Sequence, residues 1–194
     1  MQLRVKLAVG VAVLGVAGVS TAAIAQDRSR LAAFMQGYEE VPAISTEANG
    51  IFKASISRSD DEIRYTLVYF GPFNTAAGAS GPGTVTQSHI HLGQRGVNGG
   101  ISVFLCGTPG FQPPAPTPAP PPCPPPGTPV SGVLRPENVI GPAVQGIQPG
   151  EFAELVRAIR AGATYANVHT TVHPGGEIRG QINGDDDRGR GRDD

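Results

Sequence analysis

The sequence has no tryptophan, only two methionines and two cysteines, and charged residues make up 16% of it, where roughly a quarter is usual. Its basic residues form no patch that could neutralise a phosphate backbone, which argues against nucleic acid as a partner. There is no Gly-x-Ser-x-Gly nucleophile elbow, and the glycines between 93 and 100 do not precede a helix as a phosphate-binding loop requires. We therefore predict no catalytic residue from motifs.

The first residues have the pattern of a targeting segment. Arg4 and Lys6 precede an apolar run over 7–19, and Ala23-Ile24-Ala25 gives the small-x-small pattern of a cleavage site. This predicts a secretory signal peptide over 1–25. A membrane anchor is the alternative, but the run is short for a span of ~20 residues. No later apolar run could cross a bilayer, so we expect a secreted or periplasmic protein with no membrane span after cleavage.

The remaining chain suits a single domain with its own core. Without residues 1–25 it has 13 basic and 16 acidic residues, a net charge of −3. We expect a loose N-terminus over 26–30, a folded domain over 31–183, and a disordered charged tail over 184–194, because the tail has no apolar residue.

The two cysteines, Cys106 and Cys123, are expected to form a disulfide in an oxidising compartment. A thiolate metal or redox site is the alternative, but the spacing is not Cys-x-x-Cys and proline dominates the segment between them. Proline lacks the N–H that a sheet needs. The segment 107–129 is therefore predicted to be an exposed, polyproline-like insertion that pairs with nothing in a sheet.

Short strand-like runs separated by glycine and proline recur along the chain. They cover 50–57, 62–70, 84–92, 101–105, 130–134, 163–170 and 177–183. A helix is predicted at about 150–161, where Phe152, Leu155, Val156 and Ile159 form one apolar stripe. These elements predict an all-β fold, mainly an antiparallel β-sandwich or barrel-like structure, with one short amphipathic helix.

All four histidines lie in two short clusters, which are the best candidates for a site. His89 and His91 are two residues apart on a predicted strand, so they share a face with Cα atoms roughly 6.6 Å apart. His169, on a second strand, could supply a third ligand. Such a triad with an open fourth position is typical of zinc or copper sites. His173 fits less well, because it precedes Pro174 at an expected hairpin tip.

Hydrogen bonding is the alternative role for these imidazoles. Glu177 and Arg179 share one face of the last predicted strand and are plausible partners for them. In that case the histidines would be structural, and no metal would be needed.

Several of these segments together resemble the CHRD domain, the module named from chordin. The resemblance rests on Ser-His-Ile-His-Leu-Gly from Ser88, on Tyr-Ala-Asn-Val-His-Thr from Tyr165, and on Pro-Gly-Gly-Glu-Ile-Arg-Gly-Gln from Pro174. Glu-Glu-Val-Pro from Glu39 also matches. The likeness covers 31–182 and implies an extracytoplasmic β-rich module with no secure enzymatic activity.

The resemblance also bears on individual residues. His89, His91 and His169 match the family pattern, whereas His173 departs from it. Structural motif roles are expected for the remaining signature residues, namely Asn167, Glu177 and Arg179. Chordin binds bone morphogenetic proteins, but that partner need not carry over to a single-domain protein, so an unknown extracellular protein or ligand is expected.

Three functions remain open at this point. The first is a secreted binding module of the cell envelope or exterior, non-enzymatic, holding one copper or zinc ion on the motif histidines. The second is a metal-dependent redox enzyme, since the His-x-His strand is loosely similar to copper,zinc superoxide dismutases. The bridging histidine and zinc-ligand cluster of those enzymes are not evident here. The third is a purely structural envelope or matrix protein.

Overall fold

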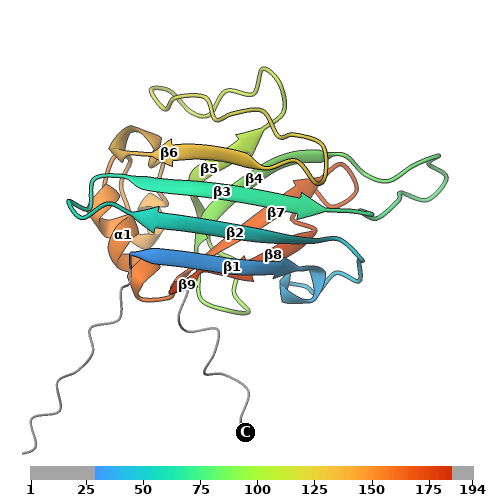
Figure 1. Cartoon of the computed structure of the whole chain (residues 1–194), viewed down its shortest axis with the longest axis horizontal. Coiled ribbons are helices and arrows are strands. Elements are labelled where there is room, and N and C mark those ends of the chain that lie inside the picture. Colours follow the sequence, from blue (N-terminus) through green and yellow to red (C-terminus); the bar gives the residue numbers. More distant parts are fainter. Residues whose placement is uncertain (1–28, 185–194) are drawn as a thin grey trace, which may run out of the picture.

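The computed structural model describes residues 29–184 (Figure 1). The predicted signal peptide (1–25) and residues 185–194 of the predicted tail lie outside these residues. Gly184, the first residue assigned to that tail, instead belongs to strand β9 (Asn183–Gly184) and pairs with Leu31. Among the residues described, no helix is long and apolar enough to cross a membrane.

The described chain is mostly β-structure. The strands are β1 (Arg30–Gln36), β2 (Asn49–Ile56), β3 (Ile63–Phe70), β4 (Val85–Leu92), β5 (Gly100–Gly107), β6 (Val130–Leu134), β7 (Thr164–Thr170), β8 (Ile178–Gln181) and β9 (Asn183–Gly184). One α-helix, α1 (Phe152–Arg160), and three short 3₁₀ turns (Gly37–Glu39, Pro136–Asn138 and Ala143–Gln145) complete the described elements.

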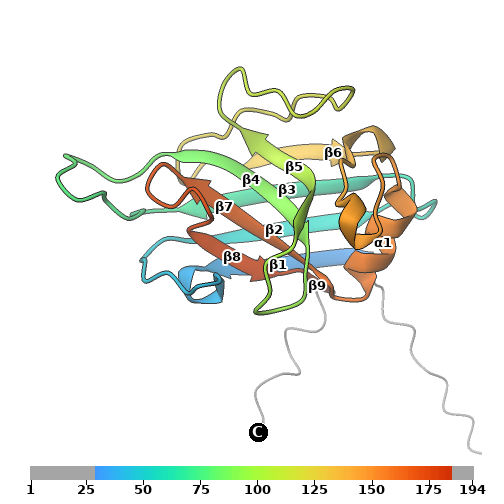
Figure 2. The same ribbon diagram turned by 180° about the vertical axis from the view of Figure 1, so that it is seen from behind.

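The strands form one antiparallel sheet in the order β5-β4-β7-β8-β1-β2-β3-β6, with β9 paired to β1. Figures 1 and 2 show β1, β2, β3 and β6 in one layer and β4, β5, β7 and β8 in a second layer that crosses it, behind it in Figure 1 and in front of it in Figure 2. The end strands β5 and β6 approach each other, and the Tyr65 hydroxyl donates to the Leu105 carbonyl across the gap at 2.6 Å. The sheet is therefore a nearly closed barrel, which confirms the predicted fold class.

Alternation along the strands places the core inside this barrel. On β3, Ile63, Tyr65, Leu67 and Tyr69 are at most 4% exposed, while the residues that alternate with them are exposed or half-buried. On β7, by contrast, all seven residues are buried. Its second face must therefore be covered from outside the barrel, and that covered outer face positions the candidate site.

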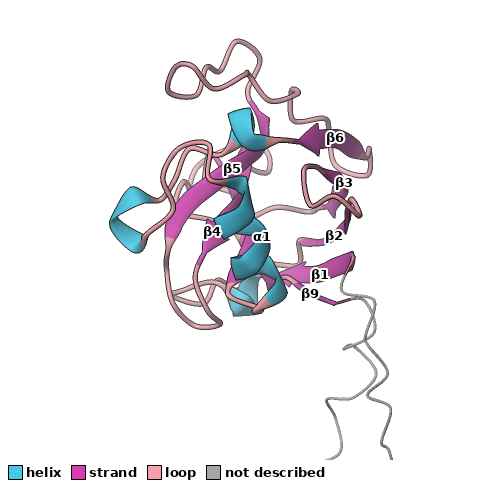
Figure 3. Cartoon of the chain, turned by 90° about the vertical axis from the view of Figure 1, so that its left-hand side faces the viewer, coloured by secondary structure: helices cyan, strands magenta, loops and turns pink. Residues whose placement is uncertain are grey.

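The helix α1 closes one end of the barrel, as Figure 3 shows. Its buried residues are the predicted stripe, Phe152, Leu155, Val156 and Ile159. The helix lies inside the predicted span of 150–161 and is followed by Gly162 with φ +67°, a left-handed conformation that favours glycine.

The sequence patterns missed one strand and one pairing. Arg30 belongs to β1 and pairs with Ser55, although 26–30 was expected to be loose. The insertion 107–129 was expected to pair with nothing in a sheet, but Gly107 and Pro122 form a parallel bridge. That bridge is possible because the neighbours of Pro122 supply its bonds: the Cys123 N–H donates to Gly107 and the Pro121 carbonyl accepts from it.

The predicted disulfide joins Cys106 at the end of β5 to Cys123. The two Cα atoms are 4.9 Å apart, and the link fixes the proline-rich segment to the barrel. On this side of the molecule Phe111 packs against Phe104, with ring centroids 4.9 Å apart. The segment thereby covers part of the outer face of β5.

Candidate metal centre

The strand β4 presents two histidines on the outer face of the barrel. Ile90 between them points into the core and has no exposed surface. His89 is 3% and His91 8% exposed. The antiparallel register with β7 places Asn167 opposite His89 and Tyr165 opposite His91.

The strand β7 brings the third histidine to the same place. His169 lies opposite Gln87 and two residues beyond Asn167, on the outward side of the strand. Its Nε2 is 3.0 Å from Nδ1 of His89. One nitrogen from each of His89, His91 and His169 lies within 4.8 Å of the others. The structure thus brings together the three residues that the spacing predicted.

Each of these rings is held through the nitrogen that points away from its neighbours. His89 Nε2 is 2.9 Å from the side-chain oxygen of Gln87, His91 Nδ1 is 2.9 Å from the Gly99 carbonyl, and His169 Nδ1 is 2.9 Å from the Pro174 carbonyl. A carbonyl oxygen only accepts hydrogen bonds, so the nitrogen facing it carries the proton. This assigns the tautomers and leaves a lone pair on the nitrogen that each ring turns toward the others.

The inward nitrogens have the character of ligands. Nε2 of His91 is buried and has no hydrogen-bond partner among the described residues. The inward nitrogens of His89 and His169 lie 3.0 Å apart, and with the outer nitrogens protonated both offer lone pairs that a single cation between them could accept. Two nitrogens bound tetrahedrally to zinc at ~2.0–2.1 Å lie about 3.3 Å apart. The His89–His169 pair is already close to this spacing, whereas nitrogens 4.8 Å apart must approach each other by about 1.5 Å to share one ion.

Burial keeps the rings neutral, which is the form that binds metals. Desolvation, together with the neighbouring His169 and His91, lowers the pKa of His89 to about 2. Desolvation also lowers the pKa of His91 to about 4, partly opposed by the hydrogen bond to Gly99. The pKa of His169 is lowered by burial as well, against the hydrogen bond to Pro174.

Aromatic rings and a buried cation pack around the cluster. The His91 ring stacks on Tyr165 at 4.8 Å with 5° between the planes, and the guanidinium carbon of Arg179 lies 3.3 Å from the centroid of the Tyr165 ring. Phe104 meets His89 edge-on at 4.6 Å. These contacts fix the rings from the side that the hydrogen bonds leave open.

The loop 93–99 covers the site by binding Arg179. This residue is 1% exposed and donates to the Asn98 side chain at 3.0 Å and to the backbone carbonyls of Val97 and Gln94. The Asn98 amide in turn donates to the Val41 carbonyl at 2.8 Å. Two loops far apart in the sequence therefore close over the outer face of β7 and β8.

Glu40 is a buried acid that the sequence patterns did not identify as part of the site. It is 6% exposed, and desolvation raises its pKa to about 7 despite the charge of Arg179 and hydrogen bonds from Val41 and Asn167. The only signal for it was its place in the Glu-Glu-Val-Pro segment, which said nothing about burial. Asn167 connects Glu40 to the cluster, since its Oδ1 is 3.0 Å from Nε2 of His169.

His173 lies outside the cluster, as its spacing predicted, and contacts the Asn74 amide at 2.9 Å. Glu177 accepts hydrogen bonds from the Asn74 backbone, Thr46 and Thr170. Within the described residues neither Glu177 nor Arg179 hydrogen-bonds a histidine, so the partners expected for the imidazoles were wrong. The error has a physical cause: the rings hydrogen-bond Gln87 and the backbone carbonyls of Gly99 and Pro174 instead.

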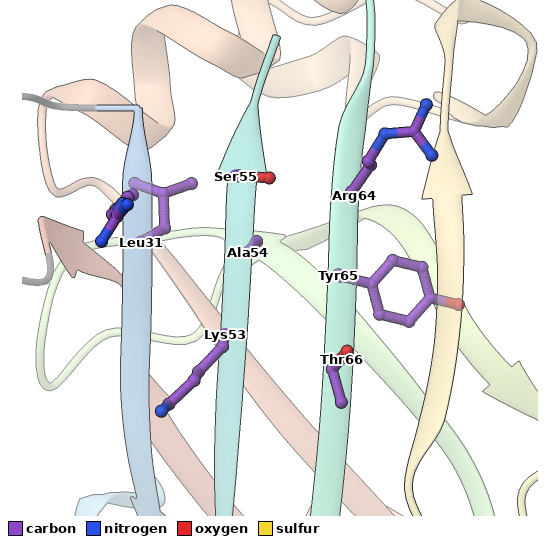
Figure 4. A pocket seen from close by; sticks show the side chains of 8 residues that line it. Leu31, Lys53, Ala54, Ser55, Arg64, Tyr65 and Thr66 are labelled. Atoms are coloured by element: carbon purple, nitrogen blue, oxygen red, sulfur yellow. The ribbon is translucent and has the colours of Figure 1, made fainter.

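A shallow groove lies elsewhere, on the outer face of β1, β2 and β3 (Figure 4). It is lined by three cationic residues, Arg30, Lys53 and Arg64. In Figure 4 Lys53 points toward β1 and Arg64 points away from it, and Arg64 pairs with Glu62 at 2.6 Å. The charges do not converge on one point, so the groove is a weaker candidate for a binding site than the histidine cluster.

The fold and the site together define an antiparallel β-barrel domain that carries a buried three-histidine cluster on the covered outer face of its sheet. This cluster could hold a metal ion. The family model of the CHRD domain matches residues 31–182, so the chain belongs to the CHRD family. Neither a curated protein nor a solved structure matches the chain.

Proposed function

We propose that this protein is a secreted metal-binding module of the cell envelope or exterior that holds one copper or zinc ion on His89, His91 and His169. The observation that carries the proposal is the arrangement of the lone pairs. Each ring is anchored through its outer nitrogen by an oxygen, and the inner nitrogens converge. Metal-bound histidines have the same arrangement, with the second nitrogen donating to a carbonyl or carboxylate.

The ligand type and the compartment support copper or zinc. Imidazole suits both ions, while magnesium and calcium prefer oxygen ligands. The disulfide between Cys106 and Cys123 fits an oxidising compartment outside the cytoplasm. This agrees with the predicted signal peptide.

Binding rather than catalysis is favoured by burial. The three histidines are at most 9% exposed, which leaves little room for a substrate beside the ion. A purely structural role would need the other tautomer of His89, with Nδ1–H donating to His169 and the Gln87 amide turned to donate to His89 Nε2, and it would leave Nε2 of His91 without a partner among the described residues. This makes the structural role the less favoured one.

Metal analysis of the mature protein, purified without a histidine tag, tests the proposal. After reconstitution and desalting we expect one equivalent of copper or zinc, because three neutral imidazoles are positioned to bind it. His169→Ala should reduce the metal content to background, while the matched control His173→Ala should keep it. Wild-type protein that retains no stoichiometric metal would overturn the proposal.

A superoxide dismutation assay on the loaded protein then separates the module from an enzyme. We expect a rate no higher than that of His169→Ala with the same total metal. A metal-dependent rate far above this control would reassign the protein as a redox enzyme.

A further inference from the structure

We propose that Asn167 supplies a fourth ligand, its side-chain carbonyl oxygen, so that the site has three nitrogens and one oxygen and prefers a divalent ion to copper(I). This inference rests on the proposed function and deepens it. Copper(I) prefers soft ligands such as sulfur, whereas a carbonyl oxygen is a hard ligand that binds harder cations more favourably.

The position of Asn167 follows from the strand register. It lies opposite His89 on the neighbouring strand and two residues from His169 on the same face of β7. It is 2% exposed, so its amide has no access to bulk water. Its Oδ1 is 3.0 Å from the inward nitrogen of His169. The oxygen therefore lies at the edge of the space that the three rings enclose.

The contact between Asn167 and His169 joins two acceptors. Nδ1 of His169 faces the Pro174 carbonyl and carries the proton, which leaves a lone pair on Nε2. The Asn167 oxygen also offers only lone pairs. Two such atoms at hydrogen-bond distance form no hydrogen bond with each other, but both can coordinate one cation between them.

Glu40 opposes a reversal of the Asn167 amide. The Asn167 amide nitrogen lies on the side of the Glu40 carboxyl, since both groups border the space beside Gly176. The amide oxygen therefore faces His169. Gly176 packs directly on this pair: a Cβ there would lie 2.5 Å from Glu40 Oε1 and 3.0 Å from Asn167 Nδ2, and its φ is +125°. Glycine at 176 thus allows the backbone to hold both side chains in place.

A second observation points to a ligand at the same place. Nε2 of His91, a residue 8% exposed, is buried and has no hydrogen-bond partner among the described residues. The Asn167 side chain is close enough to affect the pKa of His91. Asn167 thus lies beside all three histidines of the cluster.

Binding measurements with Zn²⁺, Cu²⁺ and copper(I), each added alone, test the inference. We compare wild type with Asn167→Leu, which has the same branched shape but is larger and has no oxygen, and with Asn167→Asp, which keeps an oxygen in place. Asn74→Leu serves as the matched control, because Asn74 also contacts a histidine, His173, outside the cluster.

We expect Asn167→Leu to lose about 100-fold in affinity for Zn²⁺ and Cu²⁺. This is the upper end of the loss in metal affinity that follows when a residue that only hydrogen-bonds a metal ligand is replaced. Its affinity for copper(I) should change less than 10-fold, since three imidazoles remain. Asn167→Asp should keep or tighten divalent binding and change the electron paramagnetic resonance spectrum of bound Cu²⁺, and the control should match wild type.

The possible failures are distinguishable. Wild-type protein that binds none of the ions refutes the proposed function itself. Wild-type protein that binds Cu²⁺, with an unchanged spectrum in Asn167→Asp, overturns only the inference about Asn167. If Asn167→Leu does not fold, the spectrum of Asn167→Asp decides alone, because a carboxylate in the coordination shell must alter it. Equal losses for copper(I) and the divalent ions in Asn167→Leu would also count against the inference.

Discussion

Glu177 has no exposed surface, and its three hydrogen-bond donors explain why a carboxylate can be buried there. The Asn74 N–H donates at 2.6 Å, the Thr170 hydroxyl at 2.6 Å and the Thr46 hydroxyl at 2.8 Å. A buried charge is costly unless it is fully hydrogen-bonded. This carboxylate ties the segment before β2 and the loop after β3 to the end of β7, next to the histidine cluster.

Glu177→Gln should therefore destabilise the protein. The amide NH₂ would face a donor in place of one acceptor oxygen, and the remaining bonds would lose their charge. We expect the free energy of unfolding to fall by about 2 kcal/mol. Urea titration followed by circular dichroism measures this, with the exposed Glu47→Gln as control. Equal stability of the two variants would show that the buried charge contributes nothing.

At the scale of single elements, periodicity predicted the strands that bury one face. The run 62–70 alternates between core and solvent, and β3 was found there. The strand β1 was missed because its outward residues Ala32 and Phe34 are apolar like the core residues on its inward face, so the sequence shows no alternation. Phe34 is 52% exposed, and an apolar residue on the solvent side removes the signal on which periodicity depends.

The candidate site divides in the same way. The shared face of His89 and His91 follows from the period of two along a strand, so the sequence was sufficient. The roles of Glu40, Gln87 and the 93–99 loop were not predictable, because they depend on how separate segments fold over the outer face. Local patterns place side chains on an element, whereas the partner of a buried polar group is decided by tertiary packing.

The link between β5 and the proline-rich segment leads to a prediction for the disulfide. The double variant Cys106→Ser and Cys123→Ser releases a loop whose ends are 17 residues apart. In the chain-entropy account this lowers the free energy of unfolding by about 3 kcal/mol. Urea unfolding with and without a reductant measures it: the reductant should destabilise wild type and leave the double variant unchanged. A reductant effect of the same size on both would mean that the loss comes from another source.

At the scale of the whole molecule, the titrating groups of the site act against each other. The three cluster histidines have lowered pKa values, so below pH 6.5 the unfolded chain binds more protons than the folded one. Stability is therefore lost as the pH falls from about 6.5 toward 4. Glu40 has a raised pKa of about 7, so between pH 4.5 and 7 the folded chain holds one extra proton and loses stability as the pH rises.

The metal-free protein should accordingly become less stable on acidification, because three histidines outweigh one carboxyl. Near pH 5.5 His89 and His91 together contribute nearly two protons to the difference and Glu40 removes about one, while His169 adds in the same direction as the other histidines. The net difference is therefore about one proton or more, which corresponds to a loss of at least about 1.4 kcal/mol per pH unit. Urea unfolding in the presence of a chelator, at half-unit steps from pH 5 to 7, measures the slope. In Glu40→Gln the opposing proton is absent, so the slope should steepen by about one proton. A stability that stays flat or rises toward pH 5 would mean that the folded protein keeps its cluster protonated, and the histidines would then be hydrogen-bonding groups rather than metal ligands.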